Sequence, residues 1–231
     1  EKPALTDLNF SLKQGEFLVV CGKSGCGKST LLNLIPRFYD ASKGSVKVGG
    51  RDVREYTLED LRSRIGMVLQ KAVLFKGTIR ENMLWGNENA TDEDIMQALE
   101  VAQAKEFVDK KEGGLDFEIE QGGKNLSGGQ RQRMTIARAV VKKPDILILD
   151  DSASALDYAT DAALRKAIRQ MEGAPTVFIV SQRTSSLMSA DRILVLDDGE
   201  ATGYGTHEEL LKNCQTYREI YNSQYGKKEE A

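Results

Sequence analysis

Short apolar runs recur along the chain and predict buried strands. Val, Ile and Leu dominate these runs, and Gly, Pro or polar residues bound each of them. The runs are FLVVC (17–21), IGMVL (65–69), ILIL (146–149), TVFIV (176–180) and RILVL (192–196). Continuous apolar runs of this length are typical of strands buried on both faces, as in a parallel sheet covered by helices. The pattern therefore predicts an α/β fold with a mostly parallel sheet.

A different pattern near the N-terminus predicts strands that are only half buried. Leu8, Phe10 and Leu12 alternate with polar residues in LTDLNFSLKQGE (5–16), and GSVKVGG (44–50) alternates as well. Alternation with a period of two is expected when one face of a strand packs on a core and the other faces water. We therefore expect a small antiparallel β layer before the main sheet.

Capping patterns mark the helices. Ser or Thr followed three residues later by an acidic residue or Gln is typical of a helix start. Such pairs predict helices from Thr91 to about Lys110, from Ser127 to Lys143, and from Thr206 onward. The stretch 72–143 contains no predicted strand, so we expect a helical subdomain inserted between two parts of the core, 1–71 and 144–231. The polar tail 226–231 is predicted to be frayed.

Composition and charge narrow the classes of function and the cellular location that can be expected. The chain has 231 residues, 40% hydrophobic content and a net charge of −3, which suits a globular protein and gives no reason to expect a nucleic-acid partner. Three cysteines without metal-ligand spacing favour a reducing compartment. No apolar run approaches the roughly 18 residues of a membrane span, and the first residues do not resemble a signal peptide. A cytosolic location is expected.

The sequence GKSGCGKST (22–30) predicts a nucleoside triphosphate site. It fits G-x-x-x-x-G-K-[ST], follows a predicted strand and precedes the helix-like TLLNLI. Glycines let backbone N–H groups converge on phosphate oxygens, the lysine Lys28 reaches the outer phosphates, and the hydroxyl of Ser29 can ligate Mg²⁺. The expected nucleotide-binding residues are Gly22, Ser24, Gly25, Cys26, Gly27, Lys28, Ser29 and Thr30.

Two carboxylates, Asp150 and Asp151, follow the predicted strand 146–149. In phosphate-loop enzymes the first acid at the end of a later strand helps to hold Mg²⁺, which assigns Asp150 to the metal. A second phosphate-binding surface is predicted in NLSGGQRQRMTIARAV (125–140), where two glycines stand at a helix start. Its expected ligand-binding residues are Ser127, Gly128, Gly129 and Gln130.

With these motifs the chain resembles the nucleotide-binding domain of ATP-binding-cassette (ABC) transporters along essentially its whole length. The Walker A motif is 22–30, the Q-loop glutamine is Gln70 in MVLQKAVLFKGTIRENM, the signature is 126–130, Walker B is 146–150 and the D-loop is SALD (154–157). GTIRENM and GTHEELL are similar to the exporter branch. The resemblance implies ATP as the ligand and Mg²⁺ held by Ser29, Gln70 and Asp150. It also implies transmembrane domains contacted through the Q-loop region, on the cytoplasmic side of the cell membrane.

The family pairs two such domains head to tail, so that the signature of each completes the ATP site of the other. In this sequence the two catalytic positions depart from the family pattern: Asp151 stands where a glutamate is usual, and Gln182 where a histidine is usual. The signature is intact. The sequence is thus similar to the degenerate-site half of a heterodimeric, multidrug-type exporter, whose main hydrolysis occurs at the partner's Walker site.

Several alternatives remain open at the level of sequence. They are a homodimeric exporter with two slow sites, a non-transport ABC ATPase, and a regulatory module that binds ATP without turnover. We interpret His207 as structural, and Phe10 and Phe17 as packing residues. Gln121 stands where exporters often carry a glutamate, which is either free variation in a loop or altered communication with the membrane domain. The aromatic residue that stacks on adenine in this family is expected upstream of Glu1.

Overall fold

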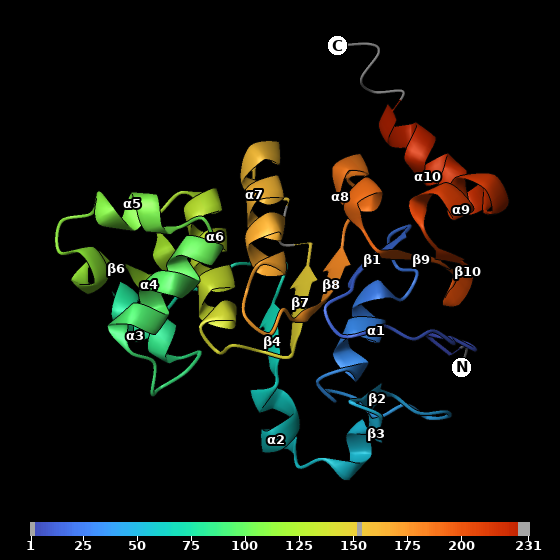
Figure 1. Cartoon of the computed structure of the whole chain (residues 1–231), viewed down its shortest axis with the longest axis horizontal. Helices are drawn as coiled ribbons and strands as arrows, with labels where there is room; N and C mark the ends of the chain where they lie inside the picture. Colours follow the sequence, from blue (N-terminus) through green and yellow to red (C-terminus); the bar gives the residue numbers. More distant parts are fainter. Residues whose placement is uncertain (1–2, 152–153, 226–231) are drawn as a thin grey trace. The chain divides into compact units, whose positions relative to one another are not determined.

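The computed structural model describes residues 3–151 and 154–225, and it divides the chain into two compact units (Figure 1). The first unit comprises Glu1–Arg62 and Thr176–Ala231, and the second comprises Ser63–Pro175. The tail 226–231, predicted to be frayed, lies outside the described residues. The boundaries predicted after residues 71 and 143 stay a prediction. Each unit is described by itself below.

A sheet with the strand order β10-β9-β1-β8 forms the core of the first unit. The central strand β1 (Phe17–Gly22) is buried along its whole length and pairs in parallel with β8 (Thr176–Val180) and β9 (Arg192–Asp197). These strands confirm three of the apolar runs. The edge strand β10 (Glu200–Gly205) pairs antiparallel with β9 and was not foreseen, because its sequence EATGYG has no apolar run.

The helices of the first unit are short apart from the last one. They are α1 (Lys28–Leu34), α2 (Leu58–Ser63), which ends at the unit boundary, α8 (Thr184–Ser189), α9 (His207–Asn213), α10 (Gln215–Tyr225) and the single 3₁₀ turn η1 (Val53–Glu55). In Figure 1, α9 and α10 lie beside β10, and α10 also contacts β9. Tyr217 of α10 is completely buried, and its hydroxyl lies 2.6 Å from Nδ1 of His207. This contact supports a structural role for His207.

The strand predicted near the N-terminus does not form among the described residues. Residues 5–12 form no regular strand, although the predicted alternation is present: Leu8, Phe10 and Leu12 are half buried and their neighbours are exposed. The segment is tied to the unit by single bonds, such as the one that the Tyr204 hydroxyl donates to the Ser11 carbonyl. Antiparallel pairing occurs instead between β2 (Lys47–Val48) and β3 (Arg51–Asp52), within and just after the second alternating stretch.

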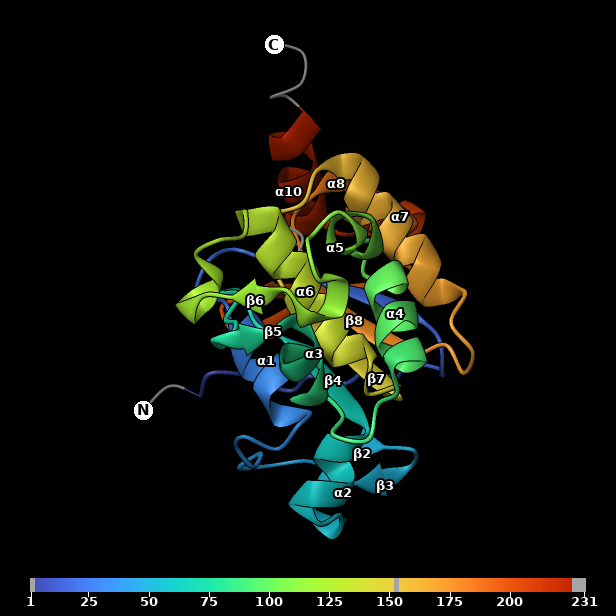
Figure 2. The same cartoon turned by 90° about the vertical axis from the view of Figure 1, so that its left-hand side faces the viewer.

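Two parallel strands and a group of helices form the second unit. β4 (Ile65–Val68) pairs with β7 (Ile146–Asp150), so that Val68 stands opposite Leu149. The helices are α3 (Ile79–Leu84), α4 (Asp92–Val101), α5 (Lys105–Asp109), α6 (Gly128–Val140) and α7 (Tyr158–Arg169), with 3₁₀ turns η2 (Gly114–Asp116) and η3 (Gln121–Gly123). Helices α3, α4 and α6 lie side by side (Figure 2).

The capping pairs locate the helix starts correctly. Thr91, Ser127 and Thr206 each form a capping box with the residue three positions later. The long helix predicted from Thr91 is wrong in its second half, however, because Gln103 adopts φ 58° and separates α4 from α5. The stretch 72–143 also contains two short strands that were not predicted, β5 (Gly77–Thr78) and β6 (Glu118–Ile119), which pair antiparallel.

Within the described part of the chain, no helix combines the length and apolarity needed to cross a membrane. The three cysteines are all buried and form no disulfide. Burial in the sheet raises the pKa of Cys21 to about 12, so this thiol stays protonated as a core residue.

Candidate functional site

The predicted phosphate loop lies between the last residue of β1 and the first residue of α1. Gly22, Gly25 and Gly27 have φ values of 147°, 79° and 101°, which residues other than glycine rarely adopt. A Cβ atom on Gly22 would lie 2.1 Å from the Leu196 carbonyl oxygen, whereas one on Gly25 would meet nothing within 4 Å. The loop is therefore packed at its base and open at Gly25, as a backbone cradle for phosphate requires.

Lys28 folds back over this loop. Its Nζ donates hydrogen bonds to the carbonyls of Gly22 at 2.8 Å and Lys23 at 2.6 Å, and it lies 3.6 Å from the Cys26 sulfur. The first of these carbonyls closes the strand and the second opens the loop. The ammonium is thus held inside the loop by neutral acceptors, which an anionic phosphate would replace favourably.

The other predicted loop residues differ in exposure. Ser24 and Ser29 are exposed, Thr30 is half buried, and Cys26 is buried at 4% exposure. The hydroxyl of Ser29 stands at the second position of α1, next to Lys28. The arrangement of the loop fits a bound triphosphate with a metal near its hydroxyl end.

Gln182 reaches the same loop from the end of β8. Its Nε2 donates a hydrogen bond of 2.8 Å to the Gly22 carbonyl. The turn that carries it is tied down because the buried Ser181 side chain accepts from the Arg183 amide at 3.1 Å. The position at which the family usually has a histidine is therefore in contact with the phosphate loop.

In the second unit the structure brings Gln70 and Asp151 together. Gln70 follows β4 by two residues and Asp151 follows β7 by one, and the register of the two strands places these positions opposite each other. Gln70 Nε2 donates to Asp151 Oδ2 at 3.3 Å. Asp151 adopts φ 46°, and its carbonyl accepts from the Ser154 hydroxyl at 2.8 Å. Asp150 is the last residue of β7 and is half buried.

The signature residues form the N-terminus of α6. The Ser127 hydroxyl accepts from the Gln130 amide at 3.2 Å, and Gln130 Oε1 accepts from the Ser127 amide at 3.0 Å. Ser127 and Gly128 are exposed, whereas a Cβ atom on Gly129 would lie 3.2 Å from the carbonyl of Ala155 in the SALD segment. The N-terminal end of α6 is therefore exposed at Ser127 and Gly128, while Gly129 lies against the SALD segment. Gln121 is exposed in the turn before it.

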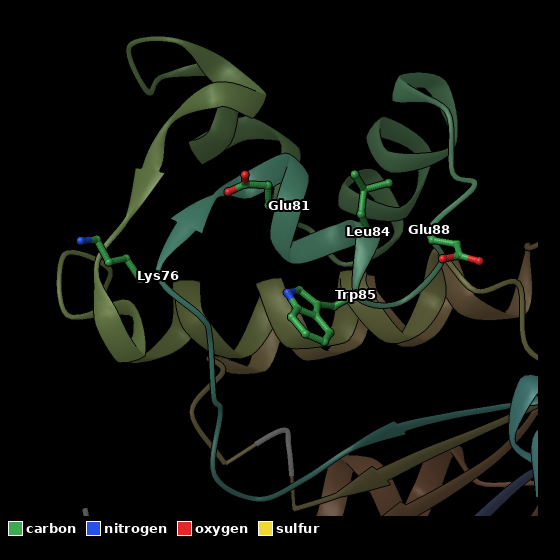
Figure 3. A pocket seen from close by; sticks show the side chains of 5 residues that line it. All are labelled: Lys76, Glu81, Leu84, Trp85 and Glu88. Carbon is green, nitrogen blue, oxygen red and sulfur yellow. The ribbon is translucent and has the colours of Figure 1, made fainter.

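Sequence inspection missed a group of exposed apolar side chains in and after the Q-loop. We call this group the Q-loop surface; its members are Leu69, Val73, Phe75 and Trp85, of which Trp85 is 71% exposed. The Phe75 and Trp85 rings are 5.1 Å apart, and the Arg138 guanidinium stands 5.5 Å from the Phe75 ring. Figure 3 shows Trp85 in the wall of an open hollow that Lys76, Glu81, Leu84 and Glu88 also line. Only the folded chain shows that these apolar side chains are outside the core.

The structure brings together only some of the predicted site residues. The Walker A loop and Gln182 are adjacent in the first unit, and Gln70 is adjacent to Asp151 in the second. Sequence reasoning missed both of these contacts. Parallel pairing could have indicated both, because Gly22 and Gln182 follow predicted strands that pair as β1 and β8, and Gln70 and Asp151 follow predicted strands that pair as β4 and β7. The order of the strands in a sheet is not a local property of the sequence, so neither pairing was predicted.

Comparisons with known proteins place these motifs in a family. Residues 5–154 match a family model described as ABC transporter. An uncharacterized ABC transporter ATP-binding protein of Bacillus subtilis is 46% identical over 227 residues, 98% of this chain and 39% of that protein. The ATP-dependent lipid A-core flippase of Vibrio vulnificus is 40% identical over 227 residues, again 98% of this chain and 39% of that protein.

A solved structure gives the same result for the fold. The structure of a bacterial Atm1-family ABC exporter with ATP bound superposes with a TM-score of 0.90 at 35% identity, over 96% of this chain and 39% of that one. The chain therefore spans about two fifths of the length of the relatives that it matches.

Proposed function

Because the chain belongs to the ABC transporter family, we propose that it is the ATP-binding and ATP-hydrolysing module of one subunit of an ABC exporter. The observation that carries the proposal is the phosphate loop, in which Lys28 is held by two backbone carbonyls at the start of a helix. Similarity to a flippase and to an ATP-bound exporter supports the direction of transport.

The roles of the residues follow from their chemistry. Lys28 exchanges its carbonyl partners for the outer phosphates of ATP, and the loop N–H groups from Ser24 to Thr30 bind the remaining phosphate oxygens. The resemblance assigns Ser29, Gln70 and Asp150 to Mg²⁺, and each side chain carries an oxygen atom, the ligand type that this ion prefers. When bound, Mg²⁺ would neutralise charge on the phosphates.

We further propose that this site hydrolyses ATP slowly. The Asp151 side chain is one methylene shorter than glutamate, and misplacement of a base by about 1 Å can cost roughly 10²-fold in rate. Gln182 is a neutral amide and cannot transfer a proton, a function that is commonly worth about 10²–10⁴-fold. Neither change lies within the loop 22–30 that binds phosphate.

The intact signature suggests an unequal pair. Ser127 and Gly128 are exposed at the start of α6, where an anion brought by another subunit can bind them. In the proposed heterodimer this signature completes a site on a partner that retains glutamate and histidine. A homodimer with two slow sites is the second candidate, because its interface would use the same residues.

We propose that the Q-loop surface binds the transmembrane domains of the exporter. Exposed Trp and Phe side chains beside a cation are typical of interface anchors. In this arrangement the chain lies on the cytoplasmic side of the membrane as part of the transporter. Trp85→Ala in the full transporter is expected to abolish ATP-dependent transport and leave ATP binding intact, whereas an unchanged transport rate would argue against this contact.

Binding of ATP with Mg²⁺ tests the core of the proposal. Lys28→Ala is expected to weaken it about 100-fold, since the charge-assisted bonding of the ammonium to the outer phosphates is lost. The matched control is Lys43→Ala, which removes an exposed lysine of the same unit. Equal affinity of the Lys28 variant and the control, measured by titration calorimetry, would contradict the assignment of the phosphate loop.

The rate of hydrolysis tests the pairing. The chain alone, kept dilute enough to stay monomeric, should turn over far more slowly than the roughly 1–10 per second of an ordinary enzyme. A rate per chain that rises with concentration would favour the homodimer. A rate that stays low until a second, different subunit is added would favour the heterodimer, and rapid turnover by the monomer would exclude both.

A further inference from the structure

One carbonyl oxygen in the first unit receives two side-chain donors. The carbonyl of Gly22 accepts from Lys28 Nζ and from Gln182 Nε2, each at 2.8 Å. A carbonyl oxygen has two lone pairs and can accept both bonds at once. The donor from α1 is six residues from Gly22 in the sequence, whereas the donor from the turn after β8 is 160 residues away, so the second bond joins distant segments.

The environment makes this carbonyl sensitive to the loss of a donor. Gly22 is buried at the end of β1, and the Leu196 carbonyl and the Cys26 sulfur fill the space where a side chain would stand. A buried carbonyl without a hydrogen-bond donor is unfavourable. When Lys28 turns its ammonium toward phosphate, the Gly22 carbonyl loses one of its two donors.

We propose that Gln182 is a positioning residue for phosphate binding, which keeps the Gly22 carbonyl hydrogen-bonded while Lys28 binds the nucleotide. The inference rests on the proposed function, because it requires that Lys28 bind phosphate. Gln182 lowers the cost of releasing Lys28 from the loop and preserves the loop's shape. Its contribution therefore falls on nucleotide affinity, not on the cleavage step alone.

The number of phosphates on the nucleotide distinguishes a role through the Gly22 carbonyl from a direct contact of Gln182 with the γ-phosphate. If Gln182 acted only as a ligand of the γ-phosphate, its loss would weaken ATP binding and leave ADP binding unchanged. If it acts through the Gly22 carbonyl, its loss weakens both nucleotides by the same factor, because Lys28 and the loop bind both of them.

The experiment compares the affinities of the full chain for Mg·ATP and Mg·ADP by titration calorimetry. Gln182→Met keeps the length of the side chain and removes the donor, and we expect both affinities to fall about fivefold, the factor that one ordinary hydrogen bond is worth. Gln14→Met is the matched control at an exposed position of the same unit and should bind as the wild type does. Circular dichroism checks that both variants are folded.

The remaining outcomes would overturn the proposal. A loss confined to ATP would assign Gln182 to the γ-phosphate, and unchanged affinity for both nucleotides would show that its bond to Gly22 contributes nothing. Either result would leave the proposed function standing as long as the wild type binds ATP. If the wild type bound neither nucleotide, the proposed function would fail together with this inference.

Discussion

The phosphate loop of the first unit and the carboxylate end of β7 in the second unit are built differently. In the loop, the bonds of Lys28 and Gln182 measure 2.6–2.8 Å and end on backbone carbonyls, of which that of Gly22 belongs to a buried residue at the end of β1. At the end of β7, the bond between Gln70 and Asp151 measures 3.3 Å and joins the side chain of an exposed residue to that of a half-buried one. The loop site is held by shorter bonds to backbone carbonyls, and the end of β7 is held by a longer bond between two side chains.

This difference corresponds to two different tasks. Binding an anion requires fixed donors, and a loop whose conformation is enforced by glycine and by packing supplies them before the ligand arrives. Cleavage requires a base at a position accurate to well below 1 Å. The contrast supports the proposal that this chain holds ATP better than it cleaves it.

A longer side chain at position 151 should reduce the difference between the two regions. Asp151→Glu is expected to raise the ATPase rate at this chain's own site by up to about 10²-fold, because the carboxylate moves closer to its usual position. Single-turnover hydrolysis by the assembled transporter measures the rate, and Asp145→Glu provides the same change at an exposed position of the same unit. A rate unaffected by the added methylene would mean that Asp151 is not the limiting group.

The rigidity of the loop can be tested with two glycines. Gly22→Ala should destabilise the protein by about 2–3 kcal/mol, since it adds a clash with the Leu196 carbonyl to an unfavourable φ. Gly25→Ala is the matched control, where only the cost of the positive φ applies, about 1 kcal/mol. Urea unfolding gives both values. Equal losses would show that the loop base can yield, and that the two regions are less different than we infer.

The signature end of the second unit depends on its cap. Ser127→Ala is expected to cost about 1 kcal/mol by removing the acceptor of the Gln130 amide. Chemical denaturation measures this cost, with Ser45→Ala as a control at an exposed serine outside any helix. The same variant should slow hydrolysis at a partner's site more than at its own. The reverse order would argue against the proposed role of the signature.

The smallest expected effect is a pH dependence in the second unit. The pKa of Asp94 is lowered from 3.8 to about 2, first by the hydrogen bond from Lys143 and then by bonds from Thr91. A carboxyl with a depressed pKa contributes stability above its unfolded pKa, and that contribution disappears as the pH falls from about 4 through about 2. The difference in unfolding free energy between wild type and Asp94→Asn should therefore shrink in this range. Glu93→Gln is the comparison at an exposed carboxylate of the same helix, and a constant difference for Asp94→Asn would refute the linkage.

The sequence by itself determined the elements whose cause is local. Apolar runs located the strands 17–21, 65–69, 146–149, 176–180 and 192–196, since a strand buried on both faces has no polar position to interrupt it. Capping boxes located the starts of α4, α6 and α9, because the bonds involved join residues three positions apart. The phosphate loop was recognisable for the same reason.

Tertiary structure decided what depends on residues distant in sequence. The helix predicted from Thr91 ends early because the chain turns at Gln103, and the stretch 5–12 alternates without a strand partner among the described residues. The bond from Gln182 to Gly22 spans two strands that meet only in the sheet. Composition and spacing therefore determined which chemical groups the chain carries. Packing decided which distant groups meet, because a contact such as that of Gln182 with Gly22 forms only when the strands β1 and β8 pair.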